Sequence, residues 1–217
     1  MTVVFDPRWP LARLARVGRD LSFGWLALNG LRLPTHLFLD PKEANRWRQG
    51  TSGKDLINQA CLGVHLSEGD VSAVALDLTA CLRGSRYRAH DGRITIHAPG
   101  SFEDFTPLGV LCHEVGHHVD FQLDRRGFSK RNKAFARALE DEPEVSSVEH
   151  NVQESFAEAI RLFITNPSLL EAGRPRRWEF LTKTLRLRPI HQSSWRRVLG
   201  RCAQHVRSSA QLWTEEG

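Results

Sequence analysis

The amino-acid sequence predicts an α+β fold that is mainly helical and contains a small sheet. Apolar residues recur at helical spacing in two long segments, 107–123 and 151–167. Two shorter segments, 71–82 and 93–99, are β-branched or alternate between polar and apolar residues, as strands do. The chain has 217 residues, of which 41% are hydrophobic and 25% are charged, so it is typical of a globular domain with or without extensions.

In chain order, the first predicted elements are a helix over residues 10–29 and a short strand within 33–40. A second helix is expected to begin at Asp40-Pro41, because Asp can cap a helix and Pro fits its first turn. The two strand segments named above follow, and the later one is expected to stop at Pro99-Gly100.

The two long helices carry clear boundary signals. Thr106 can cap the helix over 107–123, and Pro107 fits its first position. The helix over 151–167 has Asn151 at its start and Asn166-Pro167 at its stop. Around them we expect three further helices and an acidic loop. The helices are 129–142, 174–187 and 193–213, and the loop is 141–150.

Several classes of protein are disfavoured. No stretch approaches the roughly 18 consecutive apolar residues of a membrane span, and the N-terminal segment lacks the apolar core and cleavage site of a secretory signal. We therefore expect a cytoplasmic protein without membrane contact, and export by another route stays open. The four cysteines are far apart and form no CxxC pair, which argues against a disulfide scaffold or a cysteine zinc cluster.

Charge is unevenly distributed along the chain. The formal net charge is +5 and the isoelectric point is about 9.4. Acidic residues gather at 140–158, whereas the segment from Arg174 to Arg207 is basic. A basic tail can contact nucleic acid or an acidic protein, and it can equally be a solvated helix surface. No zinc finger, RNA-recognition motif or helix-turn-helix signature accompanies it.

Residues 113–117 form the pattern HExxH within the first long helix. His113 and His117 are four residues apart, so they are separated by about 40° of rotation and about 6 Å of rise and face the same way. Two neutral imidazoles placed in this way can bind one Zn²⁺. Glu114 then lies beside the metal, where it can take a proton from bound water. The pattern predicts a zinc hydrolase site with Glu114 as general base.

A catalytic zinc site needs a third protein ligand and one open position. The position six residues after His117 is Leu123, which disfavours the metzincin arrangement. Glu154 and Glu158 lie one turn apart on the second long helix and share a face. Glu154 is the candidate third ligand, with membership of a capping box at the start of its helix as the alternative. Glu158 is the candidate acceptor for the distal N–H of a ligand histidine, His113 first.

These residues carry a resemblance to a known family. HEVGHHVD (113–120), followed by ESFAEAIRLF (154–163), resembles the catalytic domain of anthrax lethal factor and its relatives, a gluzincin branch of the zinc metallopeptidases. PRRWEFLTKTL (175–185) resembles the helix that follows in that family. The resemblance covers about residues 93–187 and is specific in the two motif helices.

The resemblance implies a Zn²⁺ ion held by His113, His117 and Glu154, with Glu114 as the base. It also implies a zincin-like fold in which a small twisted sheet lies beside the HExxH helix. The edge strand of that sheet would line the cleft, and an extended peptide would pair with the strand near Arg93–His97.

One position departs from the family pattern. The family has a tyrosine seven residues before the glutamate ligand, where it stabilises the oxyanion, and this chain has Ser147. His150 is the candidate replacement, and Tyr87, the single tyrosine of the chain, and the arginines are others. Loss of an oxyanion donor costs about a hundred- to a thousandfold in rate, so the predicted activity is slow or confined to one substrate.

Three further residues near the motif have open roles. His118 is rotated by about 100° from His117 on the helix, so we expect it to be packed or exposed and not a ligand. His97 can contact substrate or serve only the strand that it ends. Asp120 can form hydrogen bonds near the site or face solvent.

The predicted function is therefore that of a zinc-dependent metallopeptidase acting on a protein or peptide substrate. The alternative is a non-catalytic or weakly active binding protein on a peptidase-like scaffold, whose basic C-terminal helices contact nucleic acid or an acidic protein. The predicted organisation has three parts. These are an N-terminal helical region over 1–70, either separate or covering the core, a zincin-like catalytic core over 71–190, and a basic C-terminal helix over 191–217.

Overall fold

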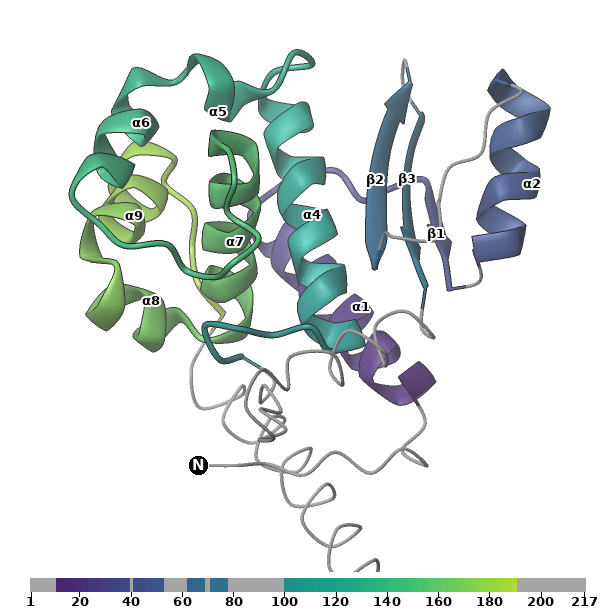
Figure 1. Cartoon of the computed structure of the whole chain (residues 1–217), viewed down its shortest axis with the longest axis horizontal. Coiled ribbons are helices and arrows are strands. Elements are labelled where there is room, and N and C mark those ends of the chain that lie inside the picture. Colours follow the sequence, from purple (N-terminus) through teal and green to yellow (C-terminus); the bar gives the residue numbers. More distant parts are fainter. Residues whose placement is uncertain (1–10, 40, 53–61, 69–70, 78–99, 191–217) are drawn as a thin grey trace, which may run out of the picture.

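The structure is a computed structural model that describes residues 11–39, 41–52, 62–68, 71–77 and 100–190. In this part of the chain, helices and a small sheet form the expected mixed α+β fold. Helix α4 (Pro107–Leu123) lies between the sheet and the remaining helices of the second half of the chain (Figure 1). The predicted strand over 93–99, with His97, the predicted helix over 193–213 and Tyr87 lie outside the described residues.

The described sheet has three strands in the order β1-β3-β2. β1 (His36–Phe38) is parallel to β3 (Val71–Leu76), and β2 (Gly63–Glu68) is antiparallel to β3. β2 is thus an edge of the described sheet. Its pairing with β3 places Gly63 opposite Leu76 and Ser67 opposite Ser72.

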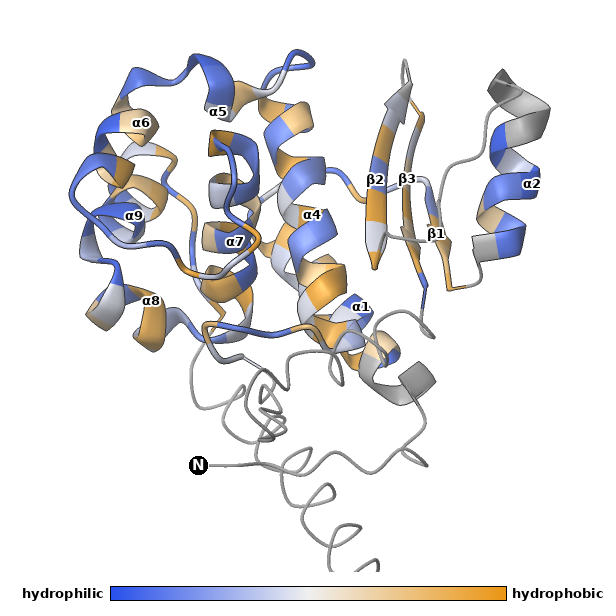
Figure 2. Ribbon diagram, viewed as in Figure 1, coloured by the Kyte–Doolittle hydropathy of each residue, from blue (hydrophilic) through white to orange (hydrophobic). Residues whose placement is uncertain are grey.

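The sheet is covered on both faces. On one face, α2 (Pro41–Ser52) packs Ala44 against Ala75 of β3. On the other face, Val110 and Leu111 of α4 pack against Val74 and Leu76. Hydrophobic residues line the strands, whereas α5 and the loop before it are hydrophilic (Figure 2).

α4 is the central helix of the fold. Thr106 caps it by accepting a hydrogen bond from the Gly109 N–H at 3.2 Å, and Pro107 occupies its first position, as predicted. α1 (Leu11–Leu28) packs along it, and Trp25 of α1 is fully buried in the main core. The Trp25 Nε1–H donates to the Arg188 carbonyl at 3.0 Å, which ties the start of the described chain to its end.

The remaining helices form a layer on the other side of α4 (Figure 1). They enclose a core rich in aromatic residues, including Phe135, Phe156 and Phe163. Their bounds are α5 (Phe128–Arg131), α6 (Lys133–Glu140), α7 (Val152–Thr165), α8 (Pro167–Gly173), α9 (Pro175–Glu179) and the π-helical turn η1 (Phe180–Thr184).

The structure differs from the sequence-based expectation in four places. The single helix expected over 174–187 is α9 followed by the π-helical turn η1, which ends at Thr184. The single helix expected over 129–142 is two helices, because Asn132 ends α5 and caps α6 by accepting from the Phe135 N–H. α8 was not predicted, although Asn166 caps it with Pro167 in its first turn. β2 was not predicted either. Within the described ranges, the structure contains no helix with the length and apolarity needed to cross a bilayer.

Candidate metal centre

His113 and His117 of α4 and Glu154 of α7 converge on one point. The Glu154 Oε2 atom lies 3.0 Å from His113 Nε2 and 3.4 Å from His117 Nε2. One ligand atom from each residue lies within 4.8 Å of the others, and the two imidazole planes are inclined at 83°. The predicted trio therefore comes together from two helices that are distant in the sequence.

This donor set fits a zinc ion. Bonds of about 2.0–2.1 Å in a tetrahedral site separate neighbouring ligand atoms by about 3.3 Å, close to the two measured N–O distances. Two imidazole nitrogens and one carboxylate oxygen are also the ligands of a common type of catalytic zinc site. The capping-box alternative for Glu154 is not what the structure has. Asn151 caps α7 by accepting from the backbone N–H groups of Gln153 and Glu154, and the Glu154 side chain faces the histidines.

Glu158 holds the first histidine, as predicted. Its Oε1 atom lies 2.7 Å from His113 Nδ1. A proton on Nδ1 leaves the Nε2 lone pair free for a metal, so this contact selects the tautomer that a ligand requires.

Arg161 in turn holds Glu158, a role that the sequence did not suggest. Its Nε and Nη2 groups donate to the two carboxylate oxygens of Glu158 at 2.9 and 2.8 Å. Its Nη1 and Nη2 groups also donate to the carbonyls of Ser101 and Phe102. The guanidinium is almost fully buried, at 1% exposure. The loop before α4 is thereby connected to His113 through two side chains.

The protonation of His113 reflects its carboxylate neighbours. Burial lowers its pKa, but Glu154 and Glu158 outweigh that effect and raise the pKa of His113 to about 10 in the absence of metal. A metal ion must therefore displace a proton from this imidazole. Although burial raises the pKa of Glu158, the charge of Arg161 and the bond with His113 lower it below its usual range.

Glu114, the predicted base, is buried beside the two histidines. Burial raises its pKa above the ordinary value of a glutamate, against the opposing effect of His113 and His117. The carboxylate also accepts a hydrogen bond from the backbone N–H of His65 on β2. β2 approaches very closely here. A Cβ atom at Gly63 would lie 2.8 Å from Val110 Cγ1 and 2.9 Å from Glu114 Oε1.

The distance between α4 and α7 is set by another glycine. A Cβ atom at Gly116 would lie 2.6 Å from the Cα atom and 2.7 Å from the carbonyl oxygen of Ala157. Only a residue without a side chain lets the two backbones come this close. This approach brings Glu154, three residues before Ala157, within reach of His117.

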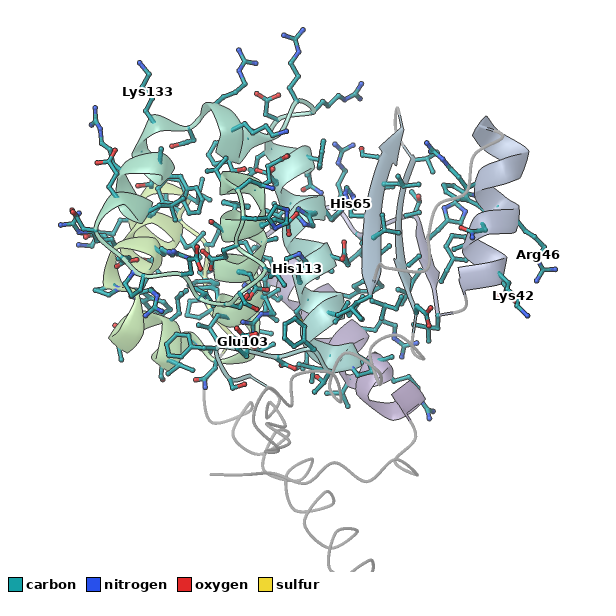
Figure 3. The ribbon with its side chains drawn as sticks, in the orientation of Figure 1. Lys42, Arg46, His65, Glu103, His113 and Lys133 are labelled. Atoms are coloured by element: carbon teal, nitrogen blue, oxygen red, sulfur yellow. The ribbon has the colours of Figure 1, made fainter. Side chains whose placement is uncertain are left out.

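The site opens into a cleft of about 540 Å³. One wall is the start of β2, from Leu62 to His65, and the opposite wall includes Ser146, Val148 and His150. Figure 3 shows His113 on α4 and His65 in the space between α4 and β2. The cleft is large enough for part of an extended peptide.

The wall formed by loop 141–150 is held by arginines of α9 and the residues before it. Arg177 is buried at 1% exposure and donates to both carboxylate oxygens of Glu149 at 2.9 Å. It also donates to the carbonyl of Pro143 at 3.1 Å. Arg174 donates to the carbonyl of Glu144, and Arg176 pairs with Asp141. Three residues of the predicted basic surface thus bind the acidic loop of the same chain.

Of the positions considered for the oxyanion donor, His150 lines the cleft and Ser147 does not. Ser147 donates its N–H and its hydroxyl to Glu103, at 2.8 and 3.3 Å, and does not line the cleft. His150 does line the cleft, and its Nδ1 atom lies 2.7 Å from the Val148 carbonyl. Since Nδ1 donates there, Nε2 can donate to substrate only in the imidazolium form.

His118 and Asp120 are structural. His118 is packed, as expected, with Nε2 2.7 Å from the Arg32 carbonyl. Asp120 is fully buried and does not face solvent, since it accepts from the Ser129 N–H and hydroxyl. His65 and Gly63 border the site without having been predicted. No motif could have marked them, because their position depends on the pairing of β2 with β3.

Comparisons of the chain with protein-family models, with curated proteins and with solved structures gave no significant match.

Proposed function

We propose that this protein is a zinc-dependent metallopeptidase of the gluzincin type, with a zincin-like core. One observation carries the proposal: two imidazoles and a carboxylate from separate helices meet at ligand distance, with a buried glutamate beside them, in an open cleft. The resemblance of the two motif helices to the lethal factor family agrees with this arrangement.

The residues of the site have separate roles in the proposed reaction. Zn²⁺ bound by His113, His117 and Glu154 would lower the pKa of a bound water and polarise the scissile carbonyl. Glu114 accepts the proton of the attacking water and delivers it to the leaving amine. Its raised pKa makes this carboxylate a stronger base than an ordinary glutamate. The His65 N–H fixes the position of its carboxylate.

The substrate backbone would pair with β2. The Asp77 N–H donates to the Leu62 carbonyl, so the even-numbered residues of β2 direct their backbone groups toward β3. Gly63, His65 and Ser67 therefore direct theirs toward the edge of β2 that is unpaired among the described strands, where the His65 N–H meets Glu114. Of the described strands, β2 borders the cleft, whereas the strand expected near Arg93–His97 lies outside the described residues.

His150 is the proposed oxyanion donor, acting through Nε2 in its protonated form. This donor needs a proton on both ring nitrogens, whereas a tyrosine hydroxyl donates in its ordinary form. This supports a slow enzyme or one with a narrow substrate range.

The test of the proposal combines metal analysis with peptide cleavage. Purified protein should contain one zinc per chain by elemental analysis and should digest a broad peptide library, and a chelator should stop the digestion. Glu114→Gln should keep its zinc but lose about 10²- to 10⁴-fold in rate. Glu171→Gln, an exposed substitution of the same kind on α8, is the matched control and should cleave normally.

A second candidate function is a metal-holding binding protein, because Ser147 is bound to Glu103 and supplies no donor to the cleft. Stoichiometric zinc without cleavage of any library peptide would favour this candidate. Absence of stoichiometric zinc would refute both.

A further inference from the structure

A second recess lies at one end of the cleft, between α4, β2 and the segment that leads into β1. It has a volume of about 140 Å³. Phe121 lines both the cleft and this recess, so the two lie next to each other. His118 also lines the recess, and its ring lies 5.4 Å from that of His65.

Two basic side chains line the recess. Its lining includes Arg32 and Arg125, both exposed, and no Asp or Glu among the described residues. The hydroxyl residues Ser67 and Ser72 form the side of the sheet, opposite each other in the strand register. Within the described residues, Arg32 forms no ion pair with a carboxylate. Two guanidinium groups with neighbouring hydroxyls match the chemistry of a carboxylate ligand.

The strand that borders the cleft leads directly into this recess. Alternate residues of a strand point to the same face, and the ring contacts of His65 with His118 and Phe121 show that this face of β2 looks toward α4. Gly63 lies beside Glu114, and Ser67 lies in the recess. Four residues of extended chain separate them, which is about 13 Å. A peptide paired with β2 at Glu114 would therefore place a residue about four positions away at the recess.

We propose that the Arg32–Arg125 recess is a subsite for an acidic side chain of the peptide substrate, about four residues from the cleaved bond. The inference rests on the proposed peptidase function and names the substrate class of that site. Because both arginines are exposed, the attraction is moderate and is screened by salt.

The test uses peptides that share a cleaved bond and differ at one position. Starting from a peptide that the protein cleaves, Glu, Gln or Lys is placed at each position up to five residues on either side of the bond, and kcat/KM is measured. Glu about four residues away, on one side of the bond, should give a kcat/KM about tenfold above Gln, with Lys lowest. The preference should shrink when the salt concentration is raised from about 0.05 M to 0.5 M.

Arginine substitutions assign the preference to the recess. Arg32→Gln and Arg125→Gln should each lower the preference for Glu about threefold, and the double variant about tenfold, with Gln peptides cleaved as before. Arg46→Gln is the matched control, because Arg46 is an exposed arginine of α2 on the far side of the sheet (Figure 3). It should keep the full preference. A preference for Glu that survives the double variant, or no preference at any position, would overturn the proposal.

Failure of the subsite can be told apart from failure of the peptidase. If no peptide is cleaved, the same Glu, Gln and Lys peptides are titrated against zinc-loaded Glu114→Gln protein by fluorescence anisotropy. Tighter binding of a Glu peptide, lost in the double arginine variant, would support the subsite in a protein without peptidase activity. Equal binding of the three peptides, or no binding, would reject it.

Discussion

The two walls of the cleft are built in different ways. Loop 141–150 is fixed by buried charge, with Glu149 held between Arg177 and the Val145 N–H at 2.9 and 2.6 Å. β2 carries His65, whose two ring nitrogens are buried and have no hydrogen-bond partner among the described residues. The loop wall is therefore held by a buried ion pair, whereas the strand wall contains a buried imidazole whose two nitrogens are unpaired among the described residues.

The two walls also differ in the pKa shifts of their buried titratable groups, Glu149 and His65. Burial raises the pKa of Glu149 above its ordinary value, although Arg177 opposes the shift. Burial, with the nearby His118 and His117, lowers the pKa of His65 to about 3. His65 is thus neutral at physiological pH and adds no charge beside the candidate metal ligands.

The largest expected effect falls on the loop wall. Arg177→Met leaves the Glu149 carboxylate buried without its counter-charge, and should lower the free energy of unfolding by about 3–5 kcal/mol. Urea denaturation measures this. Arg176→Met, which removes an exposed arginine paired with Asp141, should cost less than about 1 kcal/mol. Equal losses in the two variants would show that the buried pair does not fix the loop.

A smaller effect is expected from His65 and depends on pH. Its folded pKa of about 3 lies below the usual value of 6.5, so the folded chain binds fewer protons than the unfolded chain between these values. The contribution is complete above pH 6.5 and is lost as pH falls toward 3. Between pH 7 and pH 5, His65 should cost about 2 kcal/mol of stability.

His65→Phe keeps a ring against His118 and Phe121 and removes this titration. Unfolding measured at pH 7 and pH 5 should therefore show a loss about 2 kcal/mol smaller in the variant than in the parent protein. At pH 7 the variant should be about as stable as the parent, because apolar atoms replace unpaired polar ones. An identical pH dependence in both proteins would contradict the assignment.

The smallest effect on stability is expected at Gly63. Its substitution by Ala places a methyl group against Val110 and Glu114, at about 1 kcal/mol in unfolding free energy. Catalysis should suffer more than stability, because the displaced group is the proposed base. Gly24→Ala on α1, where a Cβ would have no neighbour within 4 Å, is the control and should leave the cleavage rate unchanged.

The sequence predicted the floor of the cleft better than its walls. α4 and α7 carry local boundary signals, Thr106-Pro107 and Asn151. The spacing of the two histidines on α4, and of Glu154 and Glu158 on α7, is that of one helix turn and can be read from the sequence. β2 lacks such signals. Its sequence, GVHLSE, becomes a strand through pairing with β3 and contact with α4, which are non-local.

The buried arginines illustrate the same limit. Charged residues in a helix are ordinarily assigned to its solvent face. Arg177 lies in the basic segment for which a solvated surface was one alternative, and Arg161 was given no role. Both are almost completely buried because a carboxylate and backbone carbonyls surround them. α8 was missed for a different reason, since Asn166-Pro167 ends one helix and begins the next.

The close approach at Gly116 has a consequence for how this site can vary. The proposed ion would touch three side chains, yet their convergence depends on a residue that contributes no atom to it. Any substituent at 116 would wedge the two helices apart and draw the carboxylate away from the imidazoles. Substitutions that change the spacing of the two backbones at Gly116 should therefore be tolerated as poorly as substitutions of the coordinating side chains.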